Sequence, residues 1–339
     1  MRLLIVTQAV DAESLTLSFF LRWIEELAGR FDTVQVICLY EGRHALPENV
    51  TVHSLGKEKG IRSKVSYAVT FLQHAWRMRK DYDAVFIHMN EEYVLVGGML
   101  WKLLGKRVYL WRNHYAGSLK TRFAGFLSDK VFYTSRHSYT ASFPRSVRMP
   151  VGVDLALFQK SSSVRIPRSI LFFGRFSPSK HPDILVEALG LLAMRNSAFS
   201  ASFYGSAAPE DEPYRAQVIA RAKELGLSAV RFFPGVPHHS APEIFGTHAL
   251  YVNLAESGMF DKMLFEAAAA GALVLARSDD WRELMGDTYA LASSEPAVLA
   301  DRIEALLGTD GAHEVLCERA QLHSLTRLGD TLAREMTLE

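Results

Sequence analysis

Residues 251–276, YVNLAESGMFDKMLFEAAAAGALVLA, contain the unit from which the fold is built. An apolar run opens the stretch, and a polar turn follows at residues 256–258. A helix is expected from Asp261 until Gly271 ends it, and a second apolar run comes next. Strand, loop, helix and strand in this order form the unit of a parallel sheet. The loop before the helix therefore lies at the carboxyl edge of the sheet, where open α/β sheets bind ligands.

Two charged side chains stand on the expected helix of this stretch. The helix N-terminus offers free N–H groups and the positive end of the dipole, which favour an anion. Lys262 lies in the first turn, where a cation is unfavourable for the dipole, so a nearby anion would explain it. Glu266 follows at i+4 and faces the same side, which makes it a partner for Lys262.

Length and composition describe a chain of two packed domains. Its 339 residues exceed one ordinary core and fit two domains of roughly 150 residues each. A hydrophobic content of 49% with 22% charged residues is typical of a soluble protein. The opening MRLLIVT predicts a strand and no signal peptide, and no apolar stretch approaches the ~20 residues of a membrane span. Cys38 and Cys317 suggest neither a disulfide nor zinc, so a cytoplasmic location is expected.

The net charge of +1 hides an asymmetry between the two halves of the chain. Residues 1–150 hold 21 Lys and Arg against 13 Asp and Glu, and the remainder holds 17 against 24. A basic first half attracts anionic partners such as phosphorylated acceptors, acidic lipid headgroups or nucleic acid. Uneven solvated surface charge explains the same counts equally well, and both interpretations stay open.

Strand and helix patterns alternate through the first 150 residues. Buried strands are expected at 3–6, 34–39, 50–55, 84–87, 108–111 and 131–134. Helices are expected at 14–27, 63–79, 93–104 and 119–127. In the second of these helices, the residues that share one face and are expected in the core are Val65, Val69, Leu72 and Trp76. The alternation predicts a doubly wound α/β domain.

Polar residues follow the fourth and fifth of these strands. His88 and Asn90 come after the fourth strand, and Arg112 and His114 come after the fifth. A lone loop histidine is more often solvated than a ligand. His114 is nevertheless the better functional candidate, because it follows a strong strand. Arg112 beside it could hold an anion bidentately. The first loop, residues 7–14, contains no glycine and is not a Gly-rich phosphate cradle.

A linker and a second α/β alternation complete the chain. Residues 144–168 carry three prolines, a Gly-Val-Asp turn and a Lys-Ser-Ser-Ser run, and are the best linker candidate. Strands are then expected at 169–173, 202–204 and 230–233, and helices at 181–194, 214–225 and from 243. After the opening stretch, Asp279 and Asp280 fall in a loop that we interpret as structural. A helix is expected at 296–307, and one long helical pattern runs from about 313 to 334.

The loop GRFSPSK, residues 174–180, is the second chemical constellation. It joins a strand end to a helix start, as an anion site should. Gly174 lets the backbone turn sharply, and Arg175 and Lys180 bracket the loop with two positive charges. Together with the helix N-terminus, these charges could neutralise a diphosphate. An ordinary basic surface loop is the alternative, because short motifs produce false positives.

These motifs resemble those of family-4 retaining glycosyltransferases of the GT-B fold. GRFSPSKHPDILVEALGLL is similar to the GR-x(4)-K segment of that family, FPGVP to its F-x-G-x-v turn, and GVDLALF to its GVD-x-x-x-F junction. ESGMFDKMLFEAAAAGALVLA resembles the loop and helix with the E-x7-E and EAMA-x-G motifs, in a subgroup variant that reads SGMFDK. The resemblance covers most of the chain and is strongest over residues 152–287.

The resemblance implies two Rossmann-like, doubly wound domains that face a central cleft. The first, residues 1–150, would bind the acceptor, and the second, residues 151–319, would bind a nucleotide-sugar donor. The terminal helix, from about residue 320 to 339, would cross back to the first domain.

The resemblance also implies roles for individual residues. Arg175 and Lys180 would hold the donor diphosphate, Glu266 would bind the ribose, and His114 matches a first-domain histidine of the family. His114, Arg175 and Lys180 are therefore the expected catalytic residues. The expected donor-binding set is Gly174, Arg175, Lys180, Gly205, Val236, Ser257, Gly258, Met259, Phe260, Lys262 and Glu266. The acceptor candidates are His88, Asn90 and Arg112.

One position departs from the family pattern. Gly258 stands where the first glutamate of E-x7-E should be, and Glu256 lies two positions away. Backbone N–H groups of residues 257–260 are therefore expected to take over the contacts of that glutamate.

The implied reaction moves a sugar from a UDP- or GDP-linked donor to an acceptor hydroxyl with retained anomeric configuration. Preorganised cations and helix N–H groups can stabilise the departing diphosphate. No D-x-D run follows a strand, so neither a metal nor another cofactor is expected. The expected acceptor is a glycan or lipid-linked intermediate of cell-envelope polysaccharide or glycolipid synthesis, at the inner face of an anionic membrane, with no role for nucleic acid. The alternatives are a nucleotide-sugar 2-epimerase of the same fold and a non-catalytic nucleotide-sugar-binding partner.

Overall fold

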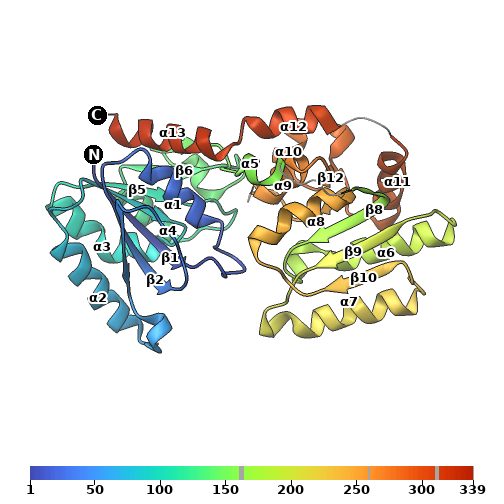
Figure 1. The fold of residues 1–339 in the computed structure, drawn as a ribbon, viewed down its shortest axis with the longest axis horizontal. Helices are drawn as coiled ribbons and strands as arrows, with labels where there is room; N and C mark the ends of the chain where they lie inside the picture. Colours follow the sequence, from blue (N-terminus) through green and yellow to red (C-terminus); the bar gives the residue numbers. More distant parts are fainter. Residues whose placement is uncertain (160–163, 259, 310–312, 339) are drawn as a thin grey trace. The chain divides into compact units, whose positions relative to one another are not determined.

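The protein folds into two compact units (Figure 1). The structure, a computed structural model, describes residues 1–339 except 160–163, 259, 310–312 and 339. One unit comprises Met1–Gly152 together with Leu325–Glu339, and the other comprises Val153–Ser324. The expectation that the terminal helix returns to the first domain is confirmed, because that helix packs on the first helix of the chain.

The described residues of the first unit build a seven-stranded sheet in which every pairing is parallel. Its order is β3 (Val50–Ser54), β2 (Val34–Glu41), β1 (Leu3–Val10), β4 (Ala84–His88), β5 (Arg107–Trp111), β6 (Lys130–Tyr133) and β7 (Ser146–Arg148). The six strands expected here are all present. Sequence patterns missed β7, because this three-residue strand lies inside the proline-containing stretch that predicted a linker. The strand order reverses between β1 and β4, which is a topological switch point.

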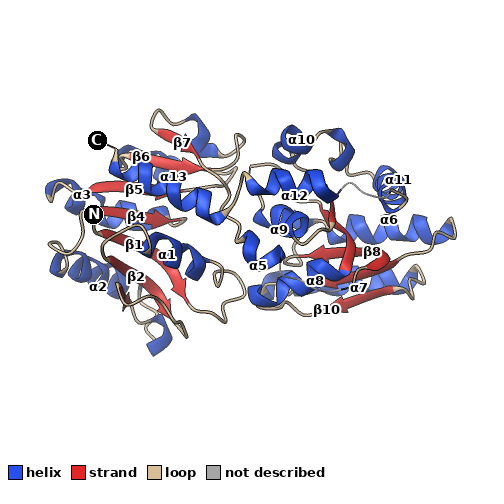
Figure 2. Cartoon of the chain, turned by 45° about the horizontal axis from the view of Figure 1, so that its top comes forward, coloured by secondary structure: helices blue, strands red, loops and turns tan. Residues whose placement is uncertain are grey.

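Helices cover both faces of this sheet (Figure 2). On one face, α2 (Lys64–Arg77), α3 (Glu91–Leu103) and α4 (Leu119–Leu127) enclose a core that includes Phe71, Trp101 and Leu127. On the other face, α1 (Phe20–Ala28) and α13 (Leu325–Thr337) enclose a core that includes Trp23 and Leu328. Within the described residues, no helix is long and apolar enough to span a bilayer.

The rotation of α2 differs from the expected one. Phe71 and Ala75 are buried, whereas Val65, Val69 and Trp76 are 73%, 49% and 50% exposed. The rings of Phe71 and Trp101 meet in a T-shaped arrangement, with a centroid distance of 5.8 Å and an angle of 89° between their planes. Packing against α3 thus decides which face of α2 is buried, and the apolar spacing of the outward residues was misleading.

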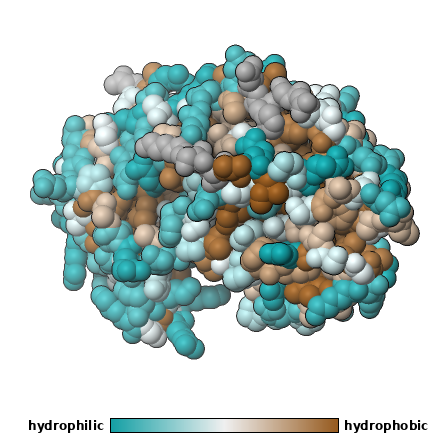
Figure 3. All heavy atoms as spheres, turned by 45° about the vertical axis from the view of Figure 1, so that its right-hand side comes forward, coloured by the Kyte–Doolittle hydropathy of each residue, from teal (hydrophilic) through white to brown (hydrophobic). Residues whose placement is uncertain are grey.

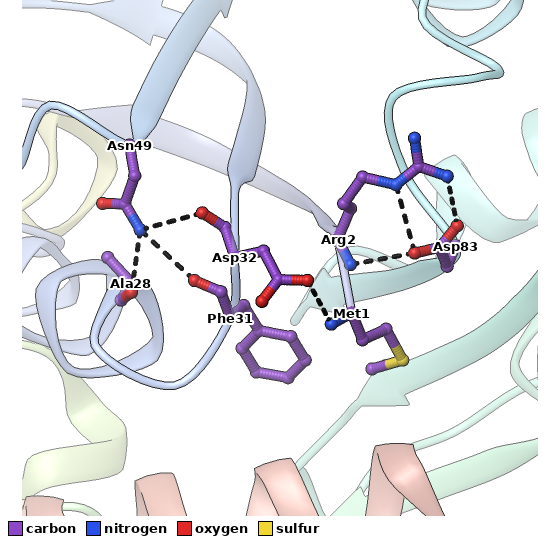
Figure 4. A network of polar contacts seen from close by, with 7 residues as sticks. All are labelled: Met1, Arg2, Ala28, Phe31, Asp32, Asn49 and Asp83. Carbon is purple, nitrogen blue, oxygen red and sulfur yellow. Dashed lines mark hydrogen bonds and ion pairs between the residues drawn. The ribbon is translucent and has the colours of Figure 1, made fainter.

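Polar contacts stabilise the first sheet at the N-terminal ends of its strands (Figure 4). The Nη2 group of Arg2 donates to Oδ1 of Asp83 at 2.6 Å, and the backbone N–H of Arg2 donates to Oδ2 at 2.9 Å. The Arg2 guanidinium lowers the pKa of Asp83 to about 2. Asn49 Nδ2 donates to the carbonyl oxygen of Ala28 at 2.9 Å, which ties the end of α1 to the chain before β3. These contacts lie at the edge opposite the strand ends that carry the expected site residues.

The second unit is built on a smaller parallel sheet. Among its described residues the strand order is β10 (Val230–Phe233), β9 (Ser200–Tyr204), β8 (Ile166–Phe173), β11 (His248–Asn253) and β12 (Leu273–Ala276). Its helices are α5 (Leu155–Gln159), α6 (Pro182–Met194), α7 (Glu212–Glu224), α8 (Ala241–Thr247), α9 (Lys262–Ala269), α10 (Asp279–Met285), α11 (Pro296–Leu307) and α12 (His313–Gln321). β11, α9 and β12 form the expected strand–loop–helix–strand unit. The face drawn in Figure 3 carries hydrophilic residues interspersed with hydrophobic ones.

The long terminal helix expected from the sequence is instead two helices, α12 and α13. Residues 322–324 separate them, because their backbone pairs with another segment. The N–H of Val153 donates to the carbonyl oxygen of His323 at 2.9 Å, and Val153 forms a parallel bridge with Ser324. The pairing with Val153 ends the helical pattern, and α13 then packs through Leu328 and Leu332 into the core of the first unit.

Candidate functional site

Loops at the carboxyl edge of the second sheet meet around the start of α9. The N–H of Gly174, at the end of β8, donates to the carbonyl oxygen of Tyr204 at 3.0 Å. A Cβ atom on Gly205 would stand 1.8 Å from the carbonyl oxygen of Gly174, and one on Gly174 would reach 4.0 Å from Cε of Met263. Only glycine fits at position 205, so the loops after β8 and β9 lie backbone against backbone.

Lys180 and Asp261 form an ion pair at the start of α9. Their Nζ and Oδ2 atoms are 2.8 Å apart, and Asn253 Nδ2 donates to the same Oδ2 at 3.2 Å. Oδ1 of Asp261 accepts from the N–H of Met263 at 3.1 Å and so caps the helix. Burial opposes ionisation of Asp261, but Lys180 outweighs it and holds the pKa of the carboxyl below its ordinary value. Lys180 is thus directed to the helix start by a carboxylate, a feature that the sequence did not indicate.

Arg175 is the exposed cation of the same loop. Its side chain makes no hydrogen bond or ion pair with any other residue that the structure describes. The loop continues through a short turn at Pro178–Lys180 to His181, whose φ of 50° leads into α6. The loop therefore presents one uncommitted charge, Arg175, and one paired charge, Lys180.

Glu266 is the buried acid of the site, with 2% of its surface exposed. Its Oε1 accepts a hydrogen bond from His238 Nε2 at 2.9 Å and lies 3.4 Å from Lys262 Nζ. Burial opposes ionisation, but Lys262 and then His238 hold the pKa of the Glu266 carboxyl below its ordinary value. The pairing with Lys262 expected from the i+4 spacing is present.

The second oxygen of Glu266 is the most informative atom of the site. Oε2 is buried and accepts no hydrogen bond from any described residue. A buried acceptor left unsatisfied costs about 1–3 kcal/mol, and more when it is charged. The carboxylate is therefore half satisfied by the protein, and its free oxygen suits a donor such as a ligand hydroxyl.

His238 is a site residue that sequence reasoning missed. It lies in the loop after β10, where only Val236 was singled out, and its ring meets Phe158 at 5.6 Å. Val236 itself is half-buried two residues before it. The signal in the sequence was a pair of adjacent histidines, 238 and 239, after a strand end. The partner of His238 could not be predicted, because Glu266 lies 28 residues later in the chain and is brought close only by the fold.

Side chains of the loop between β11 and α9 contact the neighbouring helices. Ser257 Oγ donates to Asp279 Oδ2 at 3.0 Å and accepts from the Asp279 N–H at 2.8 Å. Gly258 is buried with a φ of 101°, a conformation that favours glycine. Phe260 is 4% exposed, and its ring meets Phe265 at 4.9 Å. The side chains of Ser257 and Phe260 thus serve the fold.

Two further residues of this loop bear on the expected donor set. Met259 lies outside the described residues. Glu256 is exposed and pairs with Arg277 at 3.6 Å. That pairing accounts for Glu256 and leaves it no part in the Glu266 cluster.

In the first unit, His114 follows β5 and is half-buried. Its Nδ1 accepts a hydrogen bond from the N–H of Ala116 at 2.9 Å, so the neutral ring carries its proton on Nε2. Burial, followed by the neighbouring Arg112, lowers the pKa of the His114 ring. His114 is therefore a neutral ring with an N–H donor at Nε2 near pH 7.

Arg112 ties the elements around His114 together. Its Nε pairs with Glu91 Oε2 at 2.6 Å, and its Nη2 donates to the carbonyl oxygen of Ala116 at 3.2 Å. Oε1 of Glu91 in turn accepts from Thr121 at 3.0 Å. The sequence suggested that Arg112 could bind an anion with two N–H groups. Two of its nitrogens, Nε and Nη2, already donate to Glu91 and to the loop carbonyl of Ala116, so a bound anion would compete with these contacts.

His88 and Asn90 occupy different environments. His88 is 3% exposed and stacks on Phe20 with centroids 3.9 Å apart at 16°. It also packs against Trp23 at 5.7 Å, so it lies in the aromatic core beneath α1. This position differs from the ligand contact expected of His88. Asn90 is half-buried at the start of α3, after Met89 with its φ of 70°.

The structure thus brings Lys180, Lys262 and Glu266 together with Asp261 and His238 around the start of α9. In the other unit it groups Arg112 with His114. Among the described residues, no three His, Cys, Asp or Glu side chains are arranged to hold a metal ion.

A family model matches the part of the chain that contains the α9 cluster. Residues 156–322 match the family described as "Glycosyl transferases group 1". The D-inositol 3-phosphate glycosyltransferase of Frankia alni is 28% identical over 174 residues, which are 46% of this chain and 43% of that protein. The enzyme of the same name from Salinispora arenicola is 26% identical over 217 residues, 55% of this chain and 47% of that protein. The matches span less than half the length of these curated relatives.

Solved structures resemble the whole chain. Anabaena Alr3699/HepE in complex with UDP and glucose has a TM-score of 0.79 at 17% identity, with 100% of both chains covered. Sucrose-phosphate synthase from Thermosynechococcus elongatus has a TM-score of 0.78 at 15% identity, with 99% of this chain and 98% of that chain covered. These likenesses show the fold: two Rossmann-like units of the GT-B type.

Proposed function

We propose that the chain transfers a sugar from a nucleotide-sugar to an acceptor hydroxyl, with retained anomeric configuration, because residues 156–322 match the family model described as "Glycosyl transferases group 1". The observation that carries the proposal is the buried Glu266 carboxylate, whose Oε2 has no described donor beside the start of α9. A ribose hydroxyl would supply that donor. The complex of Anabaena HepE with UDP-glucose supports UDP as the nucleotide to test first, with GDP as the alternative.

The donor diphosphate is proposed to bind at the loop after β8. Arg175 is exposed there, and Lys180 is held at the start of α9, whose N–H groups favour an anion. Gly174 and Gly205 keep side chains away from this edge, which lets a ligand approach the backbone. Val236 would contact the nucleotide base, and the backbone of residues 257–260 would contact the sugar.

Charge stabilisation is the chemical task of these groups. As the bond to the sugar breaks, negative charge grows on the departing diphosphate, and preorganised cations and N–H groups stabilise it most in that state. Arg175, Lys180 and the start of α9 are proposed to do so without a metal. His114 would donate from Nε2 to the sugar or the acceptor in the first unit.

The acceptor side is proposed from charge and position. Asn90 and Arg112 stand after two strands of the first unit, the proposed acceptor domain, whose sequence is basic. A glycan or a lipid-linked intermediate of cell-envelope synthesis, met at the cytoplasmic face of a membrane, suits that charge. Gly258 and the outward Glu256 favour one competing function, a binding partner that holds the nucleotide-sugar without transferring it.

Titration calorimetry with UDP and GDP tests the diphosphate site. Arg175→Ala should weaken binding by about 1.5–3 kcal/mol, the range for a hydrogen bond to a charged group. Arg195→Ala is the matched control, because Arg195, directly after α6, is an exposed arginine that pairs with Asp301 of α11. Equal affinity in the two variants would refute the phosphate role. NMR of slow UDP-sugar hydrolysis separates the two functions, because a binding partner releases no sugar and a retaining enzyme first releases the donor's own anomer.

A further inference from the structure

The three helices on one face of the first sheet carry an unusual outward surface. Twenty large apolar side chains are exposed among the described residues, and nine of them lie on α2, α3 and α4. These nine, which we call the outer helix face, are Val65, Val69, Trp76, Val96, Met99, Leu103, Leu119, Phe123 and Phe126. In Figure 1, α2 and α3 lie on the side of the sheet away from α1 and α13. Among the described residues of this unit, α1 and α13 pack on the opposite face of the sheet and do not cover these side chains.

The shortest of these helices, α4, shows the pattern most clearly. Leu119, Phe123 and Phe126 are 81%, 54% and 70% exposed, and their spacing of four and three residues places them on one stripe. The rings of Phe123 and Phe126 stack with centroids 6.4 Å apart. Lys120 and Arg122, both exposed, flank the stripe, and α4 contains no acidic residue. The outward side of α4 is thus apolar and cationic.

The neighbouring helices continue this surface. Lys102 Nζ of α3 lies 5.1 Å above the ring of Phe126, which joins α3 to α4 on the outside. Just after α2, the guanidinium of Arg79 lies 4.5 Å from the centre of the half-exposed ring of Trp76, in the last turn of that helix. The acidic groups of these helices are confined to the start of α3, where Glu91 is paired with Arg112 and Glu92 is exposed. Cations therefore predominate around the apolar side chains.

A hollow opens beside Phe126. It measures about 640 Å³, and its lining includes Arg122 and Arg145 together with the aromatic residues Phe126, Tyr139 and Phe143. Neither arginine side chain pairs with another residue that the structure describes. A hollow that combines two uncommitted guanidinium groups with aromatic rings suits an anionic headgroup and the start of its apolar tail.

We infer that the outer helix face docks this chain on an anionic lipid bilayer, with α4 seated at the headgroup level. Exposed Trp, Phe and Leu partition into that region, and Lys and Arg beside them are attracted by acidic lipids. A second copy of the chain fits less well, because the cores of protein interfaces are depleted in charge and here cations stand between the apolar residues. The inference deepens the proposed use of a lipid-linked acceptor, and its test involves no sugar transfer, so the two can fail separately.

Flotation of the full chain with vesicles tests the inference. The wild type should float with phosphatidylcholine vesicles that contain phosphatidylglycerol and should remain unbound with phosphatidylcholine alone. Phe123→Ser with Phe126→Ser, and Lys120→Gln with Arg122→Gln, should each lower vesicle affinity at least about tenfold. The control, Met194→Ser with Val298→Ser, removes two exposed apolar residues from the second unit, 73% and 38% exposed, and should float like the wild type.

Three results would overturn the inference. One is unchanged flotation of both α4 variants, and another is equal binding to both kinds of vesicle at all salt concentrations. The third is a wild-type dimer in sedimentation that becomes a monomer in the Phe123→Ser, Phe126→Ser variant, which would assign the face to a second copy. Because all four α4 positions are exposed, thermal unfolding of the variants should match the wild type, which checks that they fold.

Discussion

At the scale of single residues, the start of α9 holds two carboxylates with different tasks. Glu266 keeps one oxygen without a described donor, whereas both oxygens of Asp261 are engaged by Lys180, Asn253 and the backbone. Asp261 is therefore a positioning group: it caps the helix and aims Lys180. A diphosphate bound there would compete with Asp261 for the charge of Lys180.

This competition leads to a prediction for Asp261→Asn. The variant keeps an acceptor for the helix cap but leaves Lys180 unpaired, so the protein without ligand should lose about 1–3 kcal/mol of unfolding free energy. UDP should then raise the melting temperature by more than it does in the wild type. Asp301→Asn, which breaks an exposed pair with Arg195, should cost under about 1 kcal/mol. If UDP stabilises Asp261→Asn less than the wild type, Asp261 contacts the ligand favourably and the positioning role is wrong.

Several histidines give the fold a predictable dependence on pH. Burial is the largest cause that lowers the pKa values of His53, His74, His114 and His248 below 6.5. As the pH falls, these histidines bind protons in the unfolded chain before they do so in the folded protein. The stability that their neutral rings contribute is therefore present above about pH 6.5 and is lost at lower pH. Urea unfolding should give a smaller free energy at about pH 5.5 than at about pH 7.5. In His248→Gln this difference should shrink, and an unchanged difference would contradict the assignment to His248.

At the scale of elements, the strand-end loops depend on close backbone contact. Gly205→Ala would place a Cβ atom 1.8 Å from the carbonyl oxygen of Gly174, so the loops must move apart. We expect a loss of about 1–3 kcal/mol in unfolding free energy and weaker UDP binding, measured by urea unfolding and calorimetry. Gly308→Ala is the control, because its added Cβ would come no closer than 3.5 Å to a neighbour. Equal stability of the two variants would contradict this prediction, because it would show that the loops accommodate a side chain at position 205.

Local patterns predicted the elements well where one signal decided the structure. The apolar runs and glycines around residues 251–276 were sufficient for β11, α9 and β12, and the i+4 spacing was sufficient for Lys262 and Glu266. The rotation of α2 was not predictable, because it depends on Phe71 meeting Trp101 of α3. His238 was missed for the same reason, since its partner lies in another element.

At the scale of the whole molecule, the chain crosses between its units twice, once after Gly152 and once before Leu325, and the residues next to the two crossings pair with each other. Gly152 ends the first unit and Leu325 re-enters it, and between them Val153 pairs with residues 323–324. A helical pattern alone could not show this break in the terminal helix, because its cause is a segment about 170 residues earlier in the chain. The two-unit plan itself was predictable from length and from the repeated α/β alternation.

Thermal unfolding with nucleotide-sugars tests the donor site most directly. A ligand that binds only the folded state at a hundredfold excess over its Kd adds about 2.7 kcal/mol to stability. We predict that a UDP- or GDP-linked hexose raises the melting temperature of the wild type and that the rise is much smaller in Glu266→Gln, while Glu256→Gln, in the same segment, behaves like the wild type. No rise with any of these ligands, or an equal rise in wild type and Glu266→Gln, would contradict a nucleotide-sugar site built on the free oxygen of Glu266.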